Sequence, residues 1–292
     1  MDNQKMELRQ LRDFSQNLND TFQFIKQELK PLLGSFMAIC GVFIILSGVV
    51  GGLYQQDSMK DIMKVFTGAT IKRKGIGDVF NGMYFLYIFI QFFGYILMHV
   101  VLAVYFKLYE AKGKVSPTIE EVWNKTMQYI IPLFFFSFVY IIITAVSVLF
   151  CIVPFFYFAV VFAPFVLIYV IEDCTFAVGF KRCFTLIKDN YWMSFAIYFV
   201  AYIIYVFGAS IIGAIVSVIA GLASYFTTKD VSATVAIVSG ILQVFTHVFY
   251  IIFFVSVALN YFNLTEQLDG CGLLKRIDNF GAPETIDTQE QY

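Results

Sequence analysis

An uncharged stretch of 43 residues, Tyr129–Ile171, constrains this chain more than any other feature. A helix needs about 20 apolar residues to cross about 30 Å of hydrocarbon, so the stretch is too long for one membrane span and suits two. We expect the break at Cys151–Pro154, because proline lacks the amide proton that a continuing helix needs. A membrane barrel is excluded because its strands alternate apolar and polar residues, whereas this run is continuous. The sequence therefore predicts a helical hairpin inside a membrane.

The composition extends this prediction to the whole chain. Hydrophobic residues make up 59% of the sequence and charged residues 14%, against about 45–50% and about 25% in soluble domains. This balance excludes a secreted enzyme, a nucleic-acid-binding protein and a disordered scaffold. We predict an all-α, polytopic membrane protein with six transmembrane helices, near residues 31–53, 82–106, 129–151, 154–171, 191–224 and 232–263.

The segments outside the spans predict the organisation and the orientation of the chain. We expect residues 1–30 to form a cytoplasmic segment with an amphipathic helix and no cleavable signal peptide. Residues 31–265 are the membrane domain, and 266–292 a cytoplasmic tail that is partly disordered. With the N-terminus inside, 14 of the 20 basic residues fall in inner segments and 6 in outer ones. This bias predicts that both termini are cytoplasmic, although the Lys72–Lys74 cluster on the outer side opposes it.

Each odd-numbered span is preceded by a segment with the periodicity of an amphipathic helix, which is typical of helices that lie in the headgroup layer. Thr118 and Glu121 fit a capping box that would start the second of these segments. The three units align weakly, so we predict three repeats of an interfacial helix followed by a two-span hairpin; the alternative is that any amphipathic helices align when their phases match. The apolar stripes are Phe14/Leu18/Phe22/Ile25/Leu29, Ile119/Val122/Trp123/Thr126/Ile130 and Phe176/Phe180/Cys183/Phe184/Ile187.

Four stretches of the chain carry a resemblance to a known family. They are residues 174–192 (CTFAVGFKRCFTLIKDNYW), 107–113 (KLYEAKG), 117–123, and 263–278 (NLTEQLDGCGLLKRID). With these motifs the chain resembles six-span bacterial proteins grouped with the glycerophosphoryl diester phosphodiesterase membrane domain, in the form common in Bacteroidota. The family often has Pro-Gly at a hairpin turn where this chain has Pro154 followed by Phe155.

The resemblance implies a location in the bacterial cytoplasmic (inner) membrane, but it implies no activity. Fused relatives carry a separate soluble phosphodiesterase barrel, a fold of about 250 residues. Only about 27 residues follow the last predicted span here, so we expect the catalytic domain to be absent.

Two histidines, His99 and His247, fall near the middles of the second and sixth spans, and each has a glutamine on its own helix, Gln91 and Gln243. Ionisable groups inside a membrane are costly and often functional. One reading is a pair of neutral imidazoles that hydrogen-bond to neighbouring helices; the sharper reading is a ligand or proton site. Metal binding is the least favoured reading because no carboxylate shares those spans. No catalytic or nucleotide-binding motif occurs, so we expect no catalytic, cofactor-binding or metal-binding residues.

Charged residues also flank the fourth and fifth spans. Lys181, Arg182 and Lys188 form a basic face that either contacts anionic lipid headgroups or is an ordinary solvated face. Glu172 and Asp173 close the fourth span, where we expect them to cap the following helix through its free amide groups.

Small residues recur at four-residue steps in the fifth span, at Ala209, Gly213, Ser217 and Gly221, which favours close packing of helices within the protein over a dimer seam. The cysteines match neither a zinc site nor a disulfide framework, so we expect structural roles for all of them. They are Cys40, Cys151, Cys174, Cys183 and Cys271.

These features favour a non-enzymatic membrane protein that organises the membrane or handles lipids. Its expected partners are membrane lipids and an unidentified membrane or cytoplasmic protein, with no nucleic acid and no cofactor. The alternative is a transporter or flippase subunit that uses His99 and His247 in the membrane interior. An intramembrane enzyme is the least favoured class, since no nucleophile, acid and metal set is present.

Overall fold

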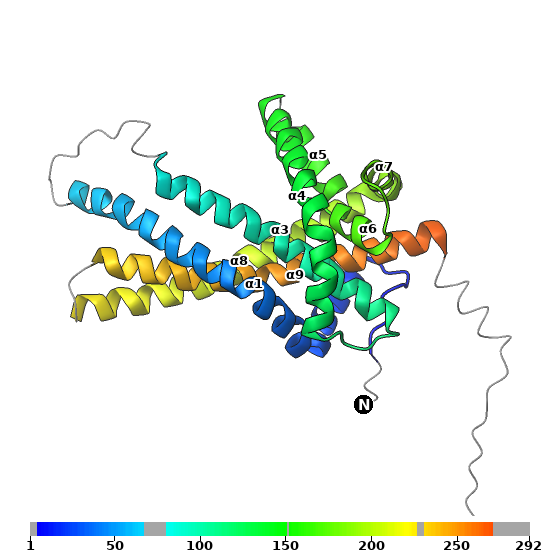
Figure 1. The fold of residues 1–292 in the computed structure, drawn as a ribbon, viewed down its shortest axis with the longest axis horizontal. Helices are drawn as coiled ribbons and strands as arrows, with labels where there is room; N and C mark the ends of the chain where they lie inside the picture. The colour runs from blue at the N-terminus through cyan, green and yellow to red at the C-terminus, as the bar shows by residue number, and fades with distance from the viewer. Residues whose placement is uncertain (1–4, 67–79, 151, 227–230, 271–292) are drawn as a thin grey trace, which may run out of the picture.

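The computed structural model describes residues 5–66, 80–150, 152–226 and 231–270, and every regular element in them is a helix (Figure 1). Cys151, Cys271, the Lys72–Lys74 cluster and the tail after Gly270 lie outside the described residues. The helices are α1 (Phe14–Phe66), α3 (Gly82–Ala111), α4 (Ile119–Phe150), α5 (Ile152–Phe162), α6 (Phe165–Ile171), α7 (Phe176–Ile187), the 3-10 helix η1 (Lys188–Asn190), α8 (Tyr191–Phe226) and α9 (Val231–Asp269).

Six helical stretches of the described chain are long and apolar enough to cross a membrane, so the prediction of an all-α, six-span protein is confirmed. Helices suit this setting because they satisfy the backbone hydrogen bonds within one segment, where lipid offers no partners. α5 and α6 together make the fourth stretch, and Pro164 stands at the start of α6 between them. The six stretches are Phe14–Gln55, Gly82–Ala111, Ile119–Leu149, Val153–Ile171, Phe176–Ala220 and Ile237–Asp269.

Only one of the three expected interfacial helices is a separate element. α7 is a separate α-helix, which the 3-10 turn η1 joins to α8. By contrast, α1 continues through Pro31 and α4 continues through Pro132. A proline removes one backbone hydrogen bond from a helix, and here that loss does not end the helix. The expected capping box does start α4: the Thr118 amide donates to Glu121 Oε2 over 2.8 Å. The threefold repeat itself stays a prediction.

The helices form a layered bundle from which one hairpin diverges (Figure 1). α1 packs along α9, α9 along α8, and α3 lies against α1. α4 begins against α3, but the α4–α5 hairpin then points away from the long axis of the other four spans. Residues 5–13, 107–118, 172–191 and 263–270 gather at one end of the bundle, which we call the polar end.

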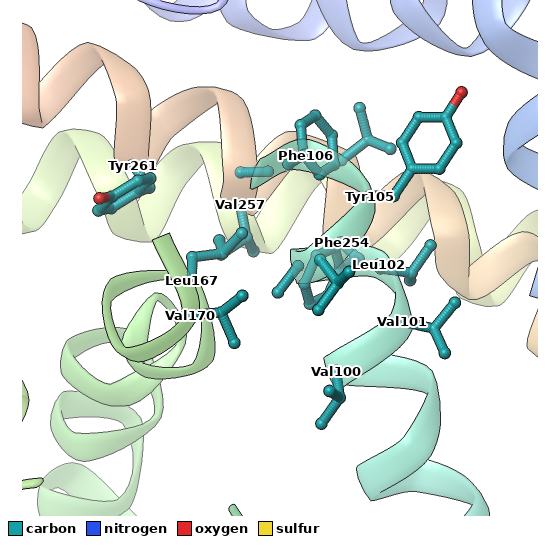
Figure 2. Close-up of a cluster of buried hydrophobic side chains, with 14 of the residues drawn as sticks. Val100, Val101, Leu102, Tyr105, Phe106, Leu167, Val170, Phe254, Val257 and Tyr261 are labelled. Carbon is teal, nitrogen blue, oxygen red and sulfur yellow. The ribbon is translucent and has the colours of Figure 1, made fainter. Parts of the chain in front are cut away.

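One part of the apolar core lies where α3, α6 and α9 meet, next to the polar end (Figure 2). Side chains from these helices converge there, including Leu102 and Phe106 of α3, Leu167 of α6 and Phe254 of α9. All four are nearly or fully buried. This core holds the ends of spans that are far apart in the sequence, so it fixes the polar groups described below.

Glycines allow α1 and α9 to approach closely further from the polar end. A Cβ atom placed on Gly48 would lie 3.0 Å from both the Cα and the carbonyl O of Gly240. Both atoms belong to backbone and cannot rotate away, so the packing requires the small residue.

We therefore predict that Gly48→Ala lowers the free energy of unfolding by about 1–3 kcal/mol, the usual cost of overpacking. The measurement is unfolding by SDS titration in mixed micelles. Gly34→Ala is the matched control, because a Cβ at Gly34 meets nothing within 4 Å on the same helix. Equal stability of the two variants would show that the α1–α9 approach does not depend on Gly48.

Candidate functional site

Polar and aromatic side chains form a stripe along α3 inside the membrane. Tyr84, Tyr87, Gln91, Tyr95 and His99 follow one another at steps of three or four residues, which places them on one helix face. The helix starts in register because Asn81 caps it, accepting a hydrogen bond from the Tyr84 amide over 2.9 Å. Gln91 donates to the Tyr87 hydroxyl over 3.2 Å and thus belongs to the part of the stripe nearest the start of α3.

His99 is held in one tautomer by two partners. Its Nδ1 lies 2.6 Å from the carbonyl O of Tyr95, and its Nε2 lies 2.7 Å from the hydroxyl of Tyr250 on α9. A carbonyl can only accept, so Nδ1 carries a proton, and in the neutral ring Nε2 then accepts from the hydroxyl of Tyr250. The structure thus gives His99 the features of a neutral imidazole bonded to a neighbouring helix.

His247 also contacts Tyr95 but has a different set of partners. It is 2% exposed, and its Nδ1 donates to the carbonyl O of Gln243 over 2.6 Å. The ring of Tyr95 packs against it, with 5.5 Å between the ring centroids. Of the four polar residues expected to form a site, His99 and His247 therefore share the neighbour Tyr95, Gln243 contributes a backbone carbonyl, and Gln91 lies apart.

Two tyrosines of α8 complete this group, and sequence reasoning missed them. The ring centroid of Tyr205 lies 5.7 Å from that of Tyr250, and Tyr202 lies 5.7 Å from Tyr205. The spacing of Tyr202 and Tyr205 on one helix face was the available signal. We call this set the His–Tyr cluster: Tyr95, His99, Tyr202, Tyr205, His247 and Tyr250.

A second polar group lies at the polar end, around Glu28 of α1. Glu28 is 1% exposed, and its Oε2 accepts from the hydroxyls of Tyr105 over 2.7 Å and Ser116 over 2.6 Å. Lys5 Nζ lies 3.2 Å from Glu28 Oε1. The buried carboxylate is therefore paired and hydrogen-bonded, and it links α1, α3 and the α3–α4 turn to the N-terminal segment.

The first half of α1 turns polar residues toward the protein. Asn17 and Thr21 are buried like Glu28, whereas Phe22 is 46% exposed and Leu29 is 50% exposed. Asn17 Oδ1 accepts from Ser256 of α9 over 3.3 Å. Because the bundle sits in lipid, apolar side chains are stable on its outside, and polar contacts join the helices inside.

The polar contacts between helices continue along α9 toward the polar end, and we call this row of contacts the polar seam. Asn260 Nδ2 donates to Ser194 and Tyr198 of α8 over 3.0 Å each. Asn263 Oδ1 accepts from the backbone amide of Arg12 over 2.9 Å. The step of three between Asn260 and Asn263 was the signal for a shared polar face. The polar seam thus connects α1 and the segment before it to α8 and α9.

Glu172 and Asp173 do not cap α7, so that expectation was wrong. Thr175 stands at the N-cap of α7 without a side-chain hydrogen bond. Asp173 instead accepts from Lys107 over 2.5 Å and from Tyr129. Desolvation alone would raise the pKa of Asp173, but the hydrogen bonds from Lys107 and Tyr129 outweigh it and lower the pKa. Asp173 therefore bonds to partners on α3 and α4, which are distant in the sequence, and not to the free amide groups at the start of α7.

The basic face of α7 is divided in two. Arg182 pairs with Glu172, 3.4 Å away, and with Asp269 at the end of α9. Lys181 and Lys188 are exposed. Arg182 therefore holds the polar end together, and only the two lysines of this face present their charge outward.

The small-residue stripe of α8 follows α9 in part. A Cβ on Gly213 would lie 3.2 Å from a methyl carbon of Leu242 of α9. Ala209 is half-buried, Ser217 is exposed, and Gly221 lies two turns beyond Gly213 in the same helix. The contact at Gly213 is one between helices of the same chain.

An apolar groove runs between α1 and α9. Its volume is about 210 Å³, and it is lined by four apolar residues between Ile25 and Leu33 of α1 and four between Val248 and Ile252 of α9. Lys26 and Lys30, both exposed, each follow a groove residue in the chain. The groove thus combines an apolar floor with two cations beside it.

The described residues contain no group of three or more His, Cys, Asp or Glu side chains that could hold a metal ion. No family model, curated protein or solved structure matches the chain. The resemblance to the glycerophosphoryl diester phosphodiesterase membrane-domain family therefore rests on the sequence motifs alone.

Proposed function

We propose that this protein is a non-enzymatic membrane protein that binds anionic phospholipid and so organises or handles membrane lipid. The observation that carries the proposal is the groove between α1 and α9 with Lys26 and Lys30 beside it. The groove suits an acyl chain, because its eight lining residues are apolar and lie in stretches that are long and apolar enough to cross a membrane. An anionic headgroup suits the lysines, each worth about 1 kcal/mol near a membrane surface.

Lys181 and Lys188 form a second set of cations for the same class of headgroup. They are exposed on α7 at the polar end. Arg182 is left out of this set because Glu172 and Asp269 already hold its guanidinium. Charge reversal at Arg182 would remove both ion pairs, so its effect on lipid retention would be mixed with an effect on stability.

Native mass spectrometry of the protein in phosphatidylglycerol nanodiscs tests the groove. Leu29→Trp should fill it, and Lys26→Glu/Lys30→Glu should repel the headgroup, so each variant should lower phosphatidylglycerol retention. The double charge reversal removes two positive charges and adds two negative ones, and the loss of the positive charges alone predicts at least about tenfold weaker retention. Ile131→Trp on α4 is the matched control, because Ile131 is 69% exposed and lies outside the groove. Unchanged retention in both groove variants would overturn the proposal; a loss only in Lys181→Glu/Lys188→Glu would move the site to α7.

A transport or flippase role is the second candidate, and the His–Tyr cluster favours it. Three spans contribute side chains to this cluster inside the membrane. A pH-dependent flux in liposomes that disappears in His99→Ala/His247→Ala would support transport, and flux that persists in this variant would count against it.

The setting we propose is the bacterial cytoplasmic membrane with both termini in the cytoplasm. The excess of basic residues in the segments on the polar side supports this orientation. Trp192, 78% exposed at the start of α8, suits the interface between headgroups and hydrocarbon on that side.

A further inference from the structure

Three tyrosine hydroxyls of the His–Tyr cluster lack a partner. Within the part of the chain that the structure describes, those of Tyr95, Tyr202 and Tyr205 make no hydrogen bond. Tyr95 is 37% exposed and Tyr202 52% exposed, so the group is open to the surroundings of the bundle. His99 and Tyr250, by contrast, satisfy each other.

These hydroxyls lie deep in the membrane. Tyr202 and Tyr205 follow the exposed Trp192 along α8, and at 1.5 Å per residue they lie roughly 15–20 Å beyond it. Tyr95 lies about 24 Å from the end of α3 at Ala111 by the same rise. Both distances exceed the depth of the headgroup layer, so the cluster lies within the hydrocarbon, which is about 30 Å thick. The hydrocarbon contains no water to bond these hydroxyls, and an acyl chain has no hydrogen-bonding group. An unpaired hydroxyl there is therefore costly.

The surroundings define the chemistry of the missing partner. No charged residue occurs in residues 82–106 or 191–226, which carry the three hydroxyls, so a charged ligand would find no counter-ion there. Hydroxyl groups donate to carbonyl oxygens, and the rings of the cluster offer flat and edge-on contacts to a planar group. Tyr250 lies between the two sides, with its ring centroid 6.4 Å from that of Tyr95 and 5.7 Å from that of Tyr205.

We propose that the His–Tyr cluster binds the ring of a lipid-soluble quinone, with Tyr95 of α3 and Tyr202 and Tyr205 of α8 donating to its carbonyl oxygens. A quinone is neutral, planar and soluble in the bilayer interior, and it has two opposed carbonyl oxygens. The site on α3 and α8 receives one oxygen from each side, and the ring packs beside Tyr250. Diacylglycerol also has carbonyl oxygens, but its ester groups lie at the headgroup boundary rather than at this depth. The proposal uses no side chain of the phospholipid groove, so it stands or falls separately from the proposed function.

Binding of decylubiquinone to the full-length protein in phosphatidylcholine nanodiscs tests this site. Tyr202→Phe/Tyr205→Phe keeps both rings and removes two donors, so the affinity should fall at least about tenfold. Tyr157→Phe is the matched control, because Tyr157 is 43% exposed on α5 and outside the cluster, and its affinity should equal that of the wild type. Tyr95→Phe should weaken binding as well, which tests the α3 side independently.

Three results would overturn the proposal. One is the absence of decylubiquinone binding above that of empty nanodiscs. Another is binding that is equal in the wild type and in Tyr202→Phe/Tyr205→Phe, which would show simple partition into the bilayer. The third is binding of dioctanoylglycerol that is lost in the double variant while decylubiquinone does not compete, which would assign the hydroxyls to a lipid ester.

Discussion

Replacing Arg12 with alanine should lower the free energy of unfolding by about 3–5 kcal/mol, the cost of removing one partner of a buried ion pair. The Arg12 side chain is fully buried, and its Nε donates to Asp20 over 2.8 Å. Its two other nitrogens donate to the carbonyl oxygens of Leu8 and Glu7, each over 2.7 Å. Burial lowers the pKa of Arg12, and Asp20 offsets part of this effect. Unfolding by SDS titration gives the free energy, and hydrogen exchange of residues 5–20 should rise.

Lys114→Ala is the control for Arg12. Lys114 Nζ lies 3.8 Å from Glu7, and both side chains are partly exposed, so its loss should cost no more than about 1 kcal/mol. If Arg12→Ala were as stable as Lys114→Ala, the N-terminal segment would not be part of the cooperative fold.

Glu28→Ala should cost about 2–4 kcal/mol, because the buried hydroxyl of Tyr105 and the partly buried hydroxyl of Ser116 lose their common acceptor. Glu28→Gln keeps one acceptor oxygen and should cost less. Thermal unfolding in detergent, followed by circular dichroism, ranks the variants. Glu120→Ala provides the baseline, since Glu120 is exposed in the first turn of α4. An effect of Glu28→Ala no larger than that of Glu120→Ala would contradict the role of this carboxylate.

Length and hydropathy were sufficient to predict the six spans, because a membrane helix must satisfy its own backbone over a fixed thickness. They did not predict which face of α1 is buried. In a soluble protein the apolar stripe that includes Phe22 and Leu29 would face the core. In lipid an apolar face is stable on either side, and the structure buries Asn17 and Glu28 instead.

The sequence also did not predict which residues pair with the charged side chains. Glu172 and Asp173 have the local pattern of a helix cap, yet their partners come from α3, α4, α7 and α9. Such contacts depend on how spans assemble, and periodicity within one segment carries no information on that.

The candidate site could be predicted in part. His99 and His247 stand out because ionisable residues are rare inside spans. Tyr202 and Tyr205 do not stand out among 18 tyrosines, since tyrosine is common at membrane interfaces. Their shared helix face and their depth along α8, measured from Trp192, make them unusual.

The packing of α1 against α9 also has a consequence for the order of events during biosynthesis. The Arg12 amide and the Asn263 side chain that it contacts are 251 residues apart, so the ribosome makes them about 13–50 s apart at 5–20 residues per second. During that interval the α9 partners of this region, Ser256 for Asn17 and Asn263 for the Arg12 amide, are not yet made. The nascent first span must therefore wait beside the translocon or a chaperone, and its lateral release should be slow until the last span has emerged.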